Sequence, residues 1–236
     1  MFPIRDINPT RITPLVTLAL IGVCLFVFFF VQNQSTGAEV EEFLFRRAVI
    51  SCEITTGDPL TAFEIVNQVC SDQPGAPVFP EKSPWVAAFT SMFLHAGLAH
   101  VLFNLWFLWI FGNNVEEAYG HGGFLVLYLI GGVAATLAFV MLNPGSTVPL
   151  VGASGAIAAV LGAYAVLFPG HRVLTLVVWF PVAIPAAIFL GIWFFAQFGL
   201  GGSNVAWEAH AGGFVFGLVA TALFRRSLIR RVALAV

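Results

Sequence analysis

Five polar residues lie inside otherwise apolar stretches of this chain, and their side chains are of types that catalyse or bind. They are Ser154, His210, His100, Asn104 and His95. Ionisable and strongly hydrogen-bonding groups are costly inside a bilayer, so they mark either a function or a buried pair. A serine hydroxyl beside an imidazole is a nucleophile–base pair, and His100 and Asn104 share a helical face because they are four residues apart. The residue types therefore suggest nucleophilic catalysis within a membrane.

Small residues surround the candidate nucleophile and the candidate base. Gly152 and Gly155 flank the serine, where free N–H groups at a helix start suit a developing oxyanion. Gly213 and Gly217 follow the histidine of the last apolar stretch and form a small-xxx-small seam. The stretch 150–168 offers a matching face of small residues, so close contact of the two helices would bring the hydroxyl within reach of the imidazole.

Each of these residues also has a purely structural interpretation. A serine in a membrane helix usually bonds a carbonyl of its own helix, and a lone histidine is more often packed than catalytic. A metal pair at His95 and His100 is not favoured, because a spacing of five places them on different helical faces. The Glu of an H-E-x-x-H zinc site is also missing between them. The sequence therefore implies neither a metal nor an organic cofactor.

The composition indicates the environment in which these residues work. Of the 236 residues, 59% are hydrophobic and 9% are charged, and the mean hydropathy is +0.92. A soluble domain carries about a quarter charged residues, so an ordinary water-soluble fold is excluded. Ten basic and twelve acidic residues give a net charge of −2, which predicts no nucleic-acid binding. We expect an all-α membrane protein in which residues 1–236 form a single domain.

Six membrane helices are expected, because a span needs about 20 mostly apolar residues. Their approximate ranges are 15–31, 93–112, 122–142, 150–168, 173–198 and 205–224. The first range resembles a signal sequence but is too long and lacks a cleavage site, so we interpret it as retained. Pro181 and Pro185 are expected to bend the fifth helix. The second and third helices are joined by a short link that contains Glu116.

Lys and Arg near the ends of spans favour the cytoplasm and set the orientation. Six spans place most of the basic residues on one side, so both termini are expected in the cytoplasm and the loop 32–84 outside. Helices two, four and six then run inward. Ser154 and His210 would each lie roughly 6–8 Å below the outer end of their helices, at a rise of about 1.5 Å per residue. With His100 they occupy one polar layer near the outer surface.

The outer loop holds two of the three cysteines, Cys52 and Cys70. A loop outside the cell is in an oxidising compartment, where the two can form a disulfide. The alternative is a pair of unpaired thiols.

Three motifs together resemble those of rhomboid intramembrane serine proteases of the compact six-span type. They are a G-x-S-G sequence, an H-x4-H-x3-N series and an A-H-x-G-G-x-x-x-G sequence, on the expected helices and in the expected order. The resemblance implies that Ser154 is the nucleophile and His210 the general base. It also implies that His100, Asn104 and the Ser154 N–H stabilise the oxyanion, with His95 in a supporting role.

The chain departs from the family pattern at two places. Phe45-Arg46-Arg47 is only a loose counterpart of the Trp-Arg motif in the first loop of some members. Ala158 stands where some members stack an aromatic residue on the catalytic histidine, and no carboxylate is evident to fix the tautomer of that histidine.

The resemblance implies an endopeptidase of the inner cell membrane, whose partners are lipid and transmembrane substrates that enter laterally between helices two and five. Cleavage is expected near the outer interface, and the sequence does not set the oligomeric state. The alternative is an inactive rhomboid-like adaptor or chaperone that binds membrane helices. A transporter or channel is less favoured, because the spans hold no deep carboxylates and no inverted repeat.

Overall fold

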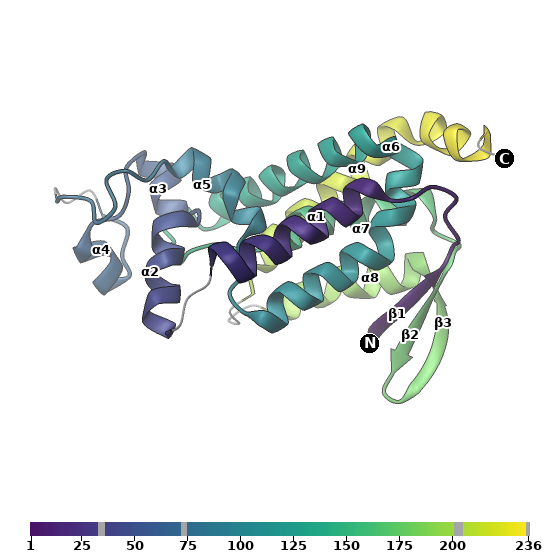
Figure 1. Ribbon diagram of the computed structural model, residues 1–236, viewed down its shortest axis with the longest axis horizontal. Coiled ribbons are helices and arrows are strands. Elements are labelled where there is room, and N and C mark those ends of the chain that lie inside the picture. Colours follow the sequence, from purple (N-terminus) through teal and green to yellow (C-terminus); the bar gives the residue numbers. More distant parts are fainter. Residues whose placement is uncertain (33–35, 72–74, 201–204, 235–236) are drawn as a thin grey trace.

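The computed structural model describes residues 1–32, 36–71, 75–200 and 205–234. Figure 1 shows a bundle of long helices with a group of short helices at one end. A three-stranded sheet lies beside the other end, from which the C-terminal part of α9 also projects.

Within the described residues, two helices are long and apolar enough to cross a membrane, by length and composition. They are α6 (Leu98–Leu142) and the Trp207–Arg231 part of α9 (Trp207–Leu234). Shorter apolar segments complete the bundle: α1 (Leu15–Phe26) with its π-helical continuation η1 (Val27–Val31), α7 (Ser154–Leu167) and α8 (Ala186–Gln197). A mainly helical chain is confirmed, but the expectation of an all-α fold is wrong because of the sheet.

The helix α6 joins the second and third expected spans in 45 residues. A link was expected between them, yet the chain stays helical as far as Gly120, where φ is 70° and ψ is 162°. This left-handed φ is one that glycine adopts without a steric penalty. The helix therefore consists of two arms that meet at Gly120, and Figure 1 shows them folding back beside each other.

The expected fifth helix, 173–198, is wrong in its first half. These residues form β2 (Arg172–Val177) and β3 (Phe180–Pro185), which pair antiparallel. The N-terminal strand β1 (Phe2–Ile7) pairs with the other edge of β2, so the sheet order is β1-β2-β3. Only the second half of the range is helical, as α8.

The residues of this segment explain why strands replace a helix. Val173, Thr175 and Val177 are β-branched and favour extended backbone. Pro181 and Pro185 would each remove a hydrogen bond from a helix interior, whereas an edge strand tolerates proline. The prolines that were expected to bend a helix instead lie in the edge strand β3.

A buried carboxylate fastens α1 to α6. Glu116 is fully buried and accepts hydrogen bonds from Val16 N at 2.8 Å, Thr17 N at 2.7 Å and Thr17 Oγ1 at 2.6 Å. His121 Nδ1 lies 2.5 Å from the same carboxylate. The first N–H groups of a helix have no partner within it, so this carboxylate caps α1. Glu116 is thus a core residue of α6 and does not lie in an exposed link.

The expected outer loop is folded into short helices. They are α2 (Gly37–Arg47), α3 (Ser51–Thr56) and α4 (Ala62–Asn67). The chain that follows the loop forms α5 (Pro84–Thr90) and the 3-10 turn η2 (Ser91–Phe93), ahead of α6. Residues 33–35 and 72–74 of that loop lie outside the described part of the chain. Cys52 and Cys70 form a disulfide across a separation of 18 residues, so the bridge is confirmed. Closing a loop of this size stabilises the fold by about 3 kcal/mol in the chain-entropy model.

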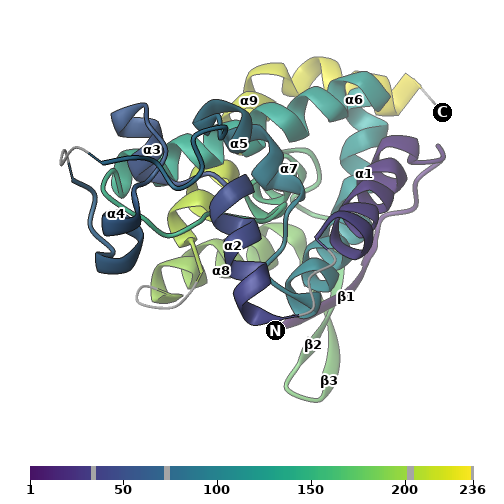
Figure 2. The same ribbon diagram turned by 60° about the vertical axis from the view of Figure 1, so that its left-hand side comes forward.

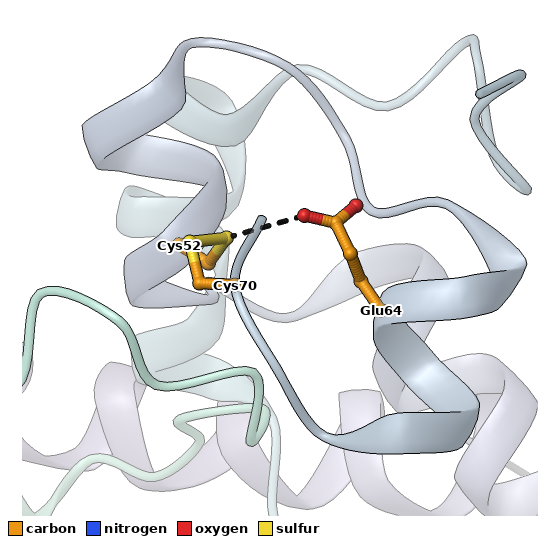
Figure 3. Close-up of side chains that lie close together, drawn as sticks. All are labelled: Cys52, Glu64 and Cys70. Atoms are coloured by element: carbon orange, nitrogen blue, oxygen red, sulfur yellow. Dashed lines mark hydrogen bonds between the residues drawn. A yellow bond between two sulfur atoms is a disulfide. The ribbon is translucent and has the colours of Figure 1, made fainter. Parts of the chain in front are cut away.

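The disulfide excludes a metal site at the place where metal-ligating side chains gather. Figure 3 shows the Glu64 carboxylate directed at the bridged sulfurs, with Oε1 3.7 Å from Cys52 Sγ. Bonded sulfurs are not thiolates, which are the form that binds metal. The carboxylate accepts hydrogen bonds from Thr61 N and Ser71 N instead, so Glu64 has a structural role.

An ion pair is buried in the same outer segment. Lys82 Nζ lies 2.6 Å from Glu53 Oε2, each side chain is 2% exposed, and the ammonium also donates to the Phe45 carbonyl at 2.7 Å. Burial raises the pKa of Glu53 and lowers that of Lys82, against the attraction between them. Lys82, just before α5, thus contacts both α2 and α3. The disulfide joins α3 to Cys70, which follows α4.

Asp6 of β1 makes the stability of the fold depend on pH. Its carboxylate accepts hydrogen bonds from Asn114 Nδ2 at 2.6 Å and Tyr164 OH at 3.0 Å, and burial raises its pKa from 3.8 to about 6. The folded state therefore holds this proton more tightly than the unfolded state, and stability falls as pH rises from about 4 to 6. We expect Asp6→Asn to remove about 1–2 kcal/mol of this fall, since the group keeps some solvent contact. Thermal unfolding in detergent between pH 4 and 7 tests this, and parallel curves for the two proteins would contradict it.

Candidate active site

A cavity of about 1030 Å³ brings together four of the five polar residues singled out from the sequence. His100 and Asn104 of α6, Ser154 of α7 and His210 of α9 all line it, so three separate helices contribute. The fifth residue, His95, lies behind this surface and is 1% exposed. The remaining lining is mostly apolar and includes residues of α2 and α8.

Glycines let α7 and α9 pack backbone against backbone. A Cβ atom at Gly213 would overlap the carbonyl of Gly155, and one at Gly217 would overlap the carbonyl of Ala159. Gly162 of α7 faces the backbone of α9 in the same way. The expected seam between these helices is confirmed, and it fixes how far apart the two elements that carry the serine and the histidine lie.

The turn before α7 places His100 against the serine. Ser154 is the first residue of α7, and Gly152 two residues earlier has a φ of 126°. A Cβ at Gly152 would lie 2.8 Å from Cε1 and Nε2 of His100 and 3.4 Å from Ser154 Oγ. Position 152 therefore requires glycine for two reasons: its φ is left-handed, and the His100 ring leaves no room for a Cβ atom.

The hydrogen bonds of His100 and Asn104 indicate which N–H groups of these side chains are free to donate. The Ala96 N–H donates to His100 Nδ1 at 3.3 Å, which places the ring proton on Nε2, the atom beside Gly152. Asn104 Nδ2 donates to the His100 carbonyl at 3.0 Å, and a second N–H of that amide remains. Both side chains can donate into the cavity next to Ser154.

His210 is oriented by a residue that the sequence interpretation missed. Its Nδ1 lies 2.7 Å from Gln197 Oε1, and the Gln197 amide is fixed because its Nε2 donates to the Trp193 carbonyl at 3.0 Å. Nδ1 must then carry the proton, which leaves Nε2 as an acceptor. Gln197 is 5% exposed and is the last residue of α8, a position that carries no motif and gave no signal in the sequence.

An aromatic ring lies beside His210, although the sequence pattern left this histidine without one from α7. Trp193 of α8 has its ring centroid 6.2 Å from that of His210, at 33° between the planes. Ala158, where an aromatic residue was missing from the pattern, is fully buried in α7. Trp193 of α8 is therefore an aromatic neighbour of this imidazole.

His95 supports the ring of His100. The two rings meet edge to face with centroids 5.3 Å apart. Gln32 holds the backbone of His95 from both sides, since its Oε1 accepts from His95 N at 2.9 Å and its Nε2 donates to the His95 carbonyl at 3.0 Å. Neither nitrogen of the His95 ring has a hydrogen-bond partner among the described residues.

The serine and the histidine face the same cavity without touching through a hydrogen bond. Both side chains are partly exposed, and among the described residues no hydrogen bond joins Ser154 Oγ to His210. Catalytic hydrogen bonds in free enzymes are often long and tighten when substrate binds. Proton transfer from the hydroxyl to Nε2 would require the two side chains, which share this cavity, to approach each other.

The chain is similar in sequence to known proteins. Residues 82–227 match the family model described as Rhomboid domain. The chain is 36% identical over 138 residues to the Rhomboid protease GluP of Bacillus subtilis (strain 168), which covers 58% of this chain and 26% of that protein. It is 44% identical over 73 residues to Rhomboid-like protein 11, chloroplastic, of Arabidopsis thaliana, covering 31% and 26%.

A mitochondrial relative, Presenilin-associated rhomboid-like protein A of Danio rerio, is 34% identical over 135 residues, covering 54% of this chain and 34% of that protein. The matched segments thus span between about a quarter and a third of the length of these relatives.

Proposed function

Because this chain belongs to the rhomboid family, we propose that it is an intramembrane serine endopeptidase that cleaves transmembrane substrates near the outer membrane interface through Ser154 and His210. The observation that carries the proposal is the shared cavity, into which three helices direct a hydroxyl, an imidazole and two donor side chains. A protein that only bound membrane helices would not need this pair.

The proposed reaction follows from the protons assigned above. Ser154 Oγ attacks the substrate carbonyl while His210 Nε2 takes its proton, and the new oxyanion accepts hydrogen bonds from the Ser154 N–H, His100 Nε2–H and the free Asn104 N–H. The imidazolium returns the proton to the leaving amine, and an acyl-enzyme remains. Water then attacks the ester carbonyl while His210 Nε2 takes its proton. The acyl C–O bond breaks as the imidazolium returns that proton to Ser154 Oγ, which releases the acid product and restores the serine.

The proposed topology counts α6 as two spans. Together with α1, α7, α8 and α9 this gives six, with both termini in the cytoplasm of an inner-membrane protein. The Cys52–Cys70 disulfide supports this orientation, because it lies in the segment that would face the oxidising side. Phe103 and Phe107 of α6 and Trp193 of α8 line the cavity, which supports substrate access between these two helices.

Gln197 is a positioning residue in this proposal. We expect Gln197→Leu to lower kcat by about 10–100-fold with little change in KM, since the imidazole loses the partner that selects its tautomer. The effect is smaller than the roughly 10⁴-fold loss in the serine protease triad, where that partner is charged. Gln197→Glu keeps an acceptor and should recover most of the activity. The role would be contradicted if Gln197→Leu lost activity only in proportion to a loss of folded protein and if Gln197→Glu did not recover the activity.

The proposal is tested with the purified chain in liposomes, co-reconstituted with a single-span protein that carries small and helix-breaking residues at the outer interface. Mass spectrometry of the products should find new termini inside the span near that interface, and none with Ser154→Ala. Stable association of the two proteins without new termini would favour the adaptor alternative and overturn the proposal.

A further inference from the structure

Two helices of the expected outer loop form one wall of the cavity that holds Ser154 and His210. Helix α2 contributes Val40, Glu41 and Leu44 to the lining, among others, and α4 also contributes. Figure 1 shows both helices at the end of the bundle away from the sheet, and Figure 2, in which that end comes forward, shows α2 in front of the bundle. A substrate bound in this cavity would therefore contact α2 as well as the proposed catalytic residues.

The helix α2 is anchored at both of its ends. Thr36 and Glu39 form a capping box at its start. At its end the buried Lys82 ammonium donates to the Phe45 carbonyl at 2.7 Å. The side chains that α2 directs into the cavity are thus presented from a fixed element, as selective binding requires.

Two of the described residues that line the cavity are acidic, and none of them is Lys or Arg. Glu41 is exposed on α2, and Glu208 is half-buried in the first turn of α9. Glu208 precedes His210 by two residues and so lies about 3 Å closer to the start of α9. In the proposed topology both carboxylates therefore lie on the outer side of the proposed base.

Neither carboxylate has a partner in the part of the chain that the structure describes. No ion pair and no side-chain hydrogen bond joins Glu41 or Glu208 to another described residue. The helix dipole favours an acid in the first turn of α9, but Glu41 lies beyond the first turn of α2. Its neighbour Glu42 does pair, with Arg46 at 3.1 Å. Glu41 thus has no evident structural role.

The chain's own basic side chains do not supply the missing partner. The outer loop holds three of them. Lys82 is buried against Glu53, and Arg46 bonds Glu42. Arg47 is absent from the described lining of the cavity. The other seven of the ten basic residues belong to the side of the termini in the proposed topology, and residues 33–35, 72–74, 201–204 and 235–236 include no Lys or Arg. A cation for the two acids of the cavity must therefore come from the molecule that enters it.

From these observations we propose that the protein selects transmembrane segments that carry Lys or Arg within the first few residues on the outer side of the scissile bond, and that Glu41 and Glu208 bind this basic flank. The inference rests on the proposed function, because it takes the cavity as the substrate site. Lys and Arg are enriched at the cytoplasmic ends of membrane spans. A basic outer flank therefore distinguishes a minority of membrane proteins, which apolar contacts alone would not.

The test uses synthetic single-span peptides with small residues at the outer end of the span, followed outward by two lysines, two glutamines or two glutamates. Their binding to the full-length Ser154→Ala protein is measured by energy transfer in phosphatidylcholine liposomes, so that neither catalysis nor lipid charge contributes. The lysine peptide should bind about 5–20-fold more tightly than the glutamate peptide, with the glutamine peptide between them. This preference should shrink in about 1 M salt, where the Debye length is about 3 Å.

Variants of the two acids assign the preference to them. Glu41→Gln combined with Glu208→Gln should reduce it to about twofold or less, and Glu41→Gln alone, at an exposed position, should remove part of it. Glu42→Gln is the matched control, because this glutamate lies on the same helix but outside the described lining of the cavity, and it should keep the full preference. Unfolding midpoints in detergent show whether each variant is folded.

Equal binding of the three peptides, or an undiminished preference in the folded glutamine variants, would overturn the inference. Cleavage rates of the wild-type protein separate this failure from a failure of the proposed function. Cleavage of all three peptides with equal kcat/KM would leave the endopeptidase in place and remove the basic flank. Selective binding of the lysine peptide without any cleavage would leave the binding site in place and remove the endopeptidase.

Discussion

Replacing Ser154 by alanine is expected to lower substrate cleavage by at least about 10³-fold while the protein stays folded. The hydroxyl is the only group at the start of α7 that can form the acyl-enzyme, and its side chain lines the cavity without supporting the core. Initial cleavage rates in liposomes measure the loss, and thermal unfolding in detergent measures the fold. A residual rate within tenfold of the wild type would contradict the role of Ser154.

Two comparisons sharpen this result. His210→Ala should cause a loss of similar size, and the double variant should be little worse than either single variant, because the two residues act as a unit. Ser227→Ala is the matched control, since this serine is exposed on α9 and, within the described part of the chain, bonds only the Phe224 carbonyl. Independent, multiplying losses from Ser154 and His210 would show that they do not share one step.

The second large effect concerns the seam between α7 and α9. Gly217→Ala should destabilise the protein by about 1–3 kcal/mol or more, because its Cβ would overlap backbone atoms of Ala159, which cannot move aside as a flexible side chain can. Activity should fall along with stability, since the helices that carry Ser154 and His210 would be forced apart. Unfolding midpoints and cleavage rates of the same preparations provide the measurement.

Gly191→Ala is the control for this substitution, because nothing lies within 4 Å of a Cβ at that position of α8. Alanine also has the higher helix propensity, so this variant should be as stable as the wild type or slightly more stable. Equal effects at both glycines would mean that the loss comes from helix propensity or expression, and the close seam would not be the cause.

The sequence predicted the parts of the site that depend on helical periodicity and small residues. The four-residue spacing of His100 and Asn104, and the glycines around Ser154 and after His210, are local patterns that survive in the structure. Apolar length likewise predicted α1 with η1 closely and the start of α9, although α9 continues ten residues beyond the predicted end at 224. These features are encoded within single helices, so one sequence suffices to find them.

The features that were missed depend on contacts between distant residues. Gln197 orients His210 across 13 residues, and Gln32 holds His95 across 63, with no motif at either glutamine. The sheet escaped detection because a continuous apolar run of β-branched residues is equally consistent with a buried strand and a membrane helix. Its partner strand β1 lies more than 160 residues earlier in the chain, beyond the reach of local pattern analysis.

The most direct test of the account is the reaction of the detergent-solubilised protein with a fluorophosphonate, followed by peptide mapping. The account predicts one adduct per chain on Ser154 Oγ, at a rate that falls sharply in His210→Ala and moderately in Gln197→Leu. Folded wild-type protein that forms no adduct, or that carries it on another serine, would contradict the claim that Ser154 and His210 form a nucleophile–base pair.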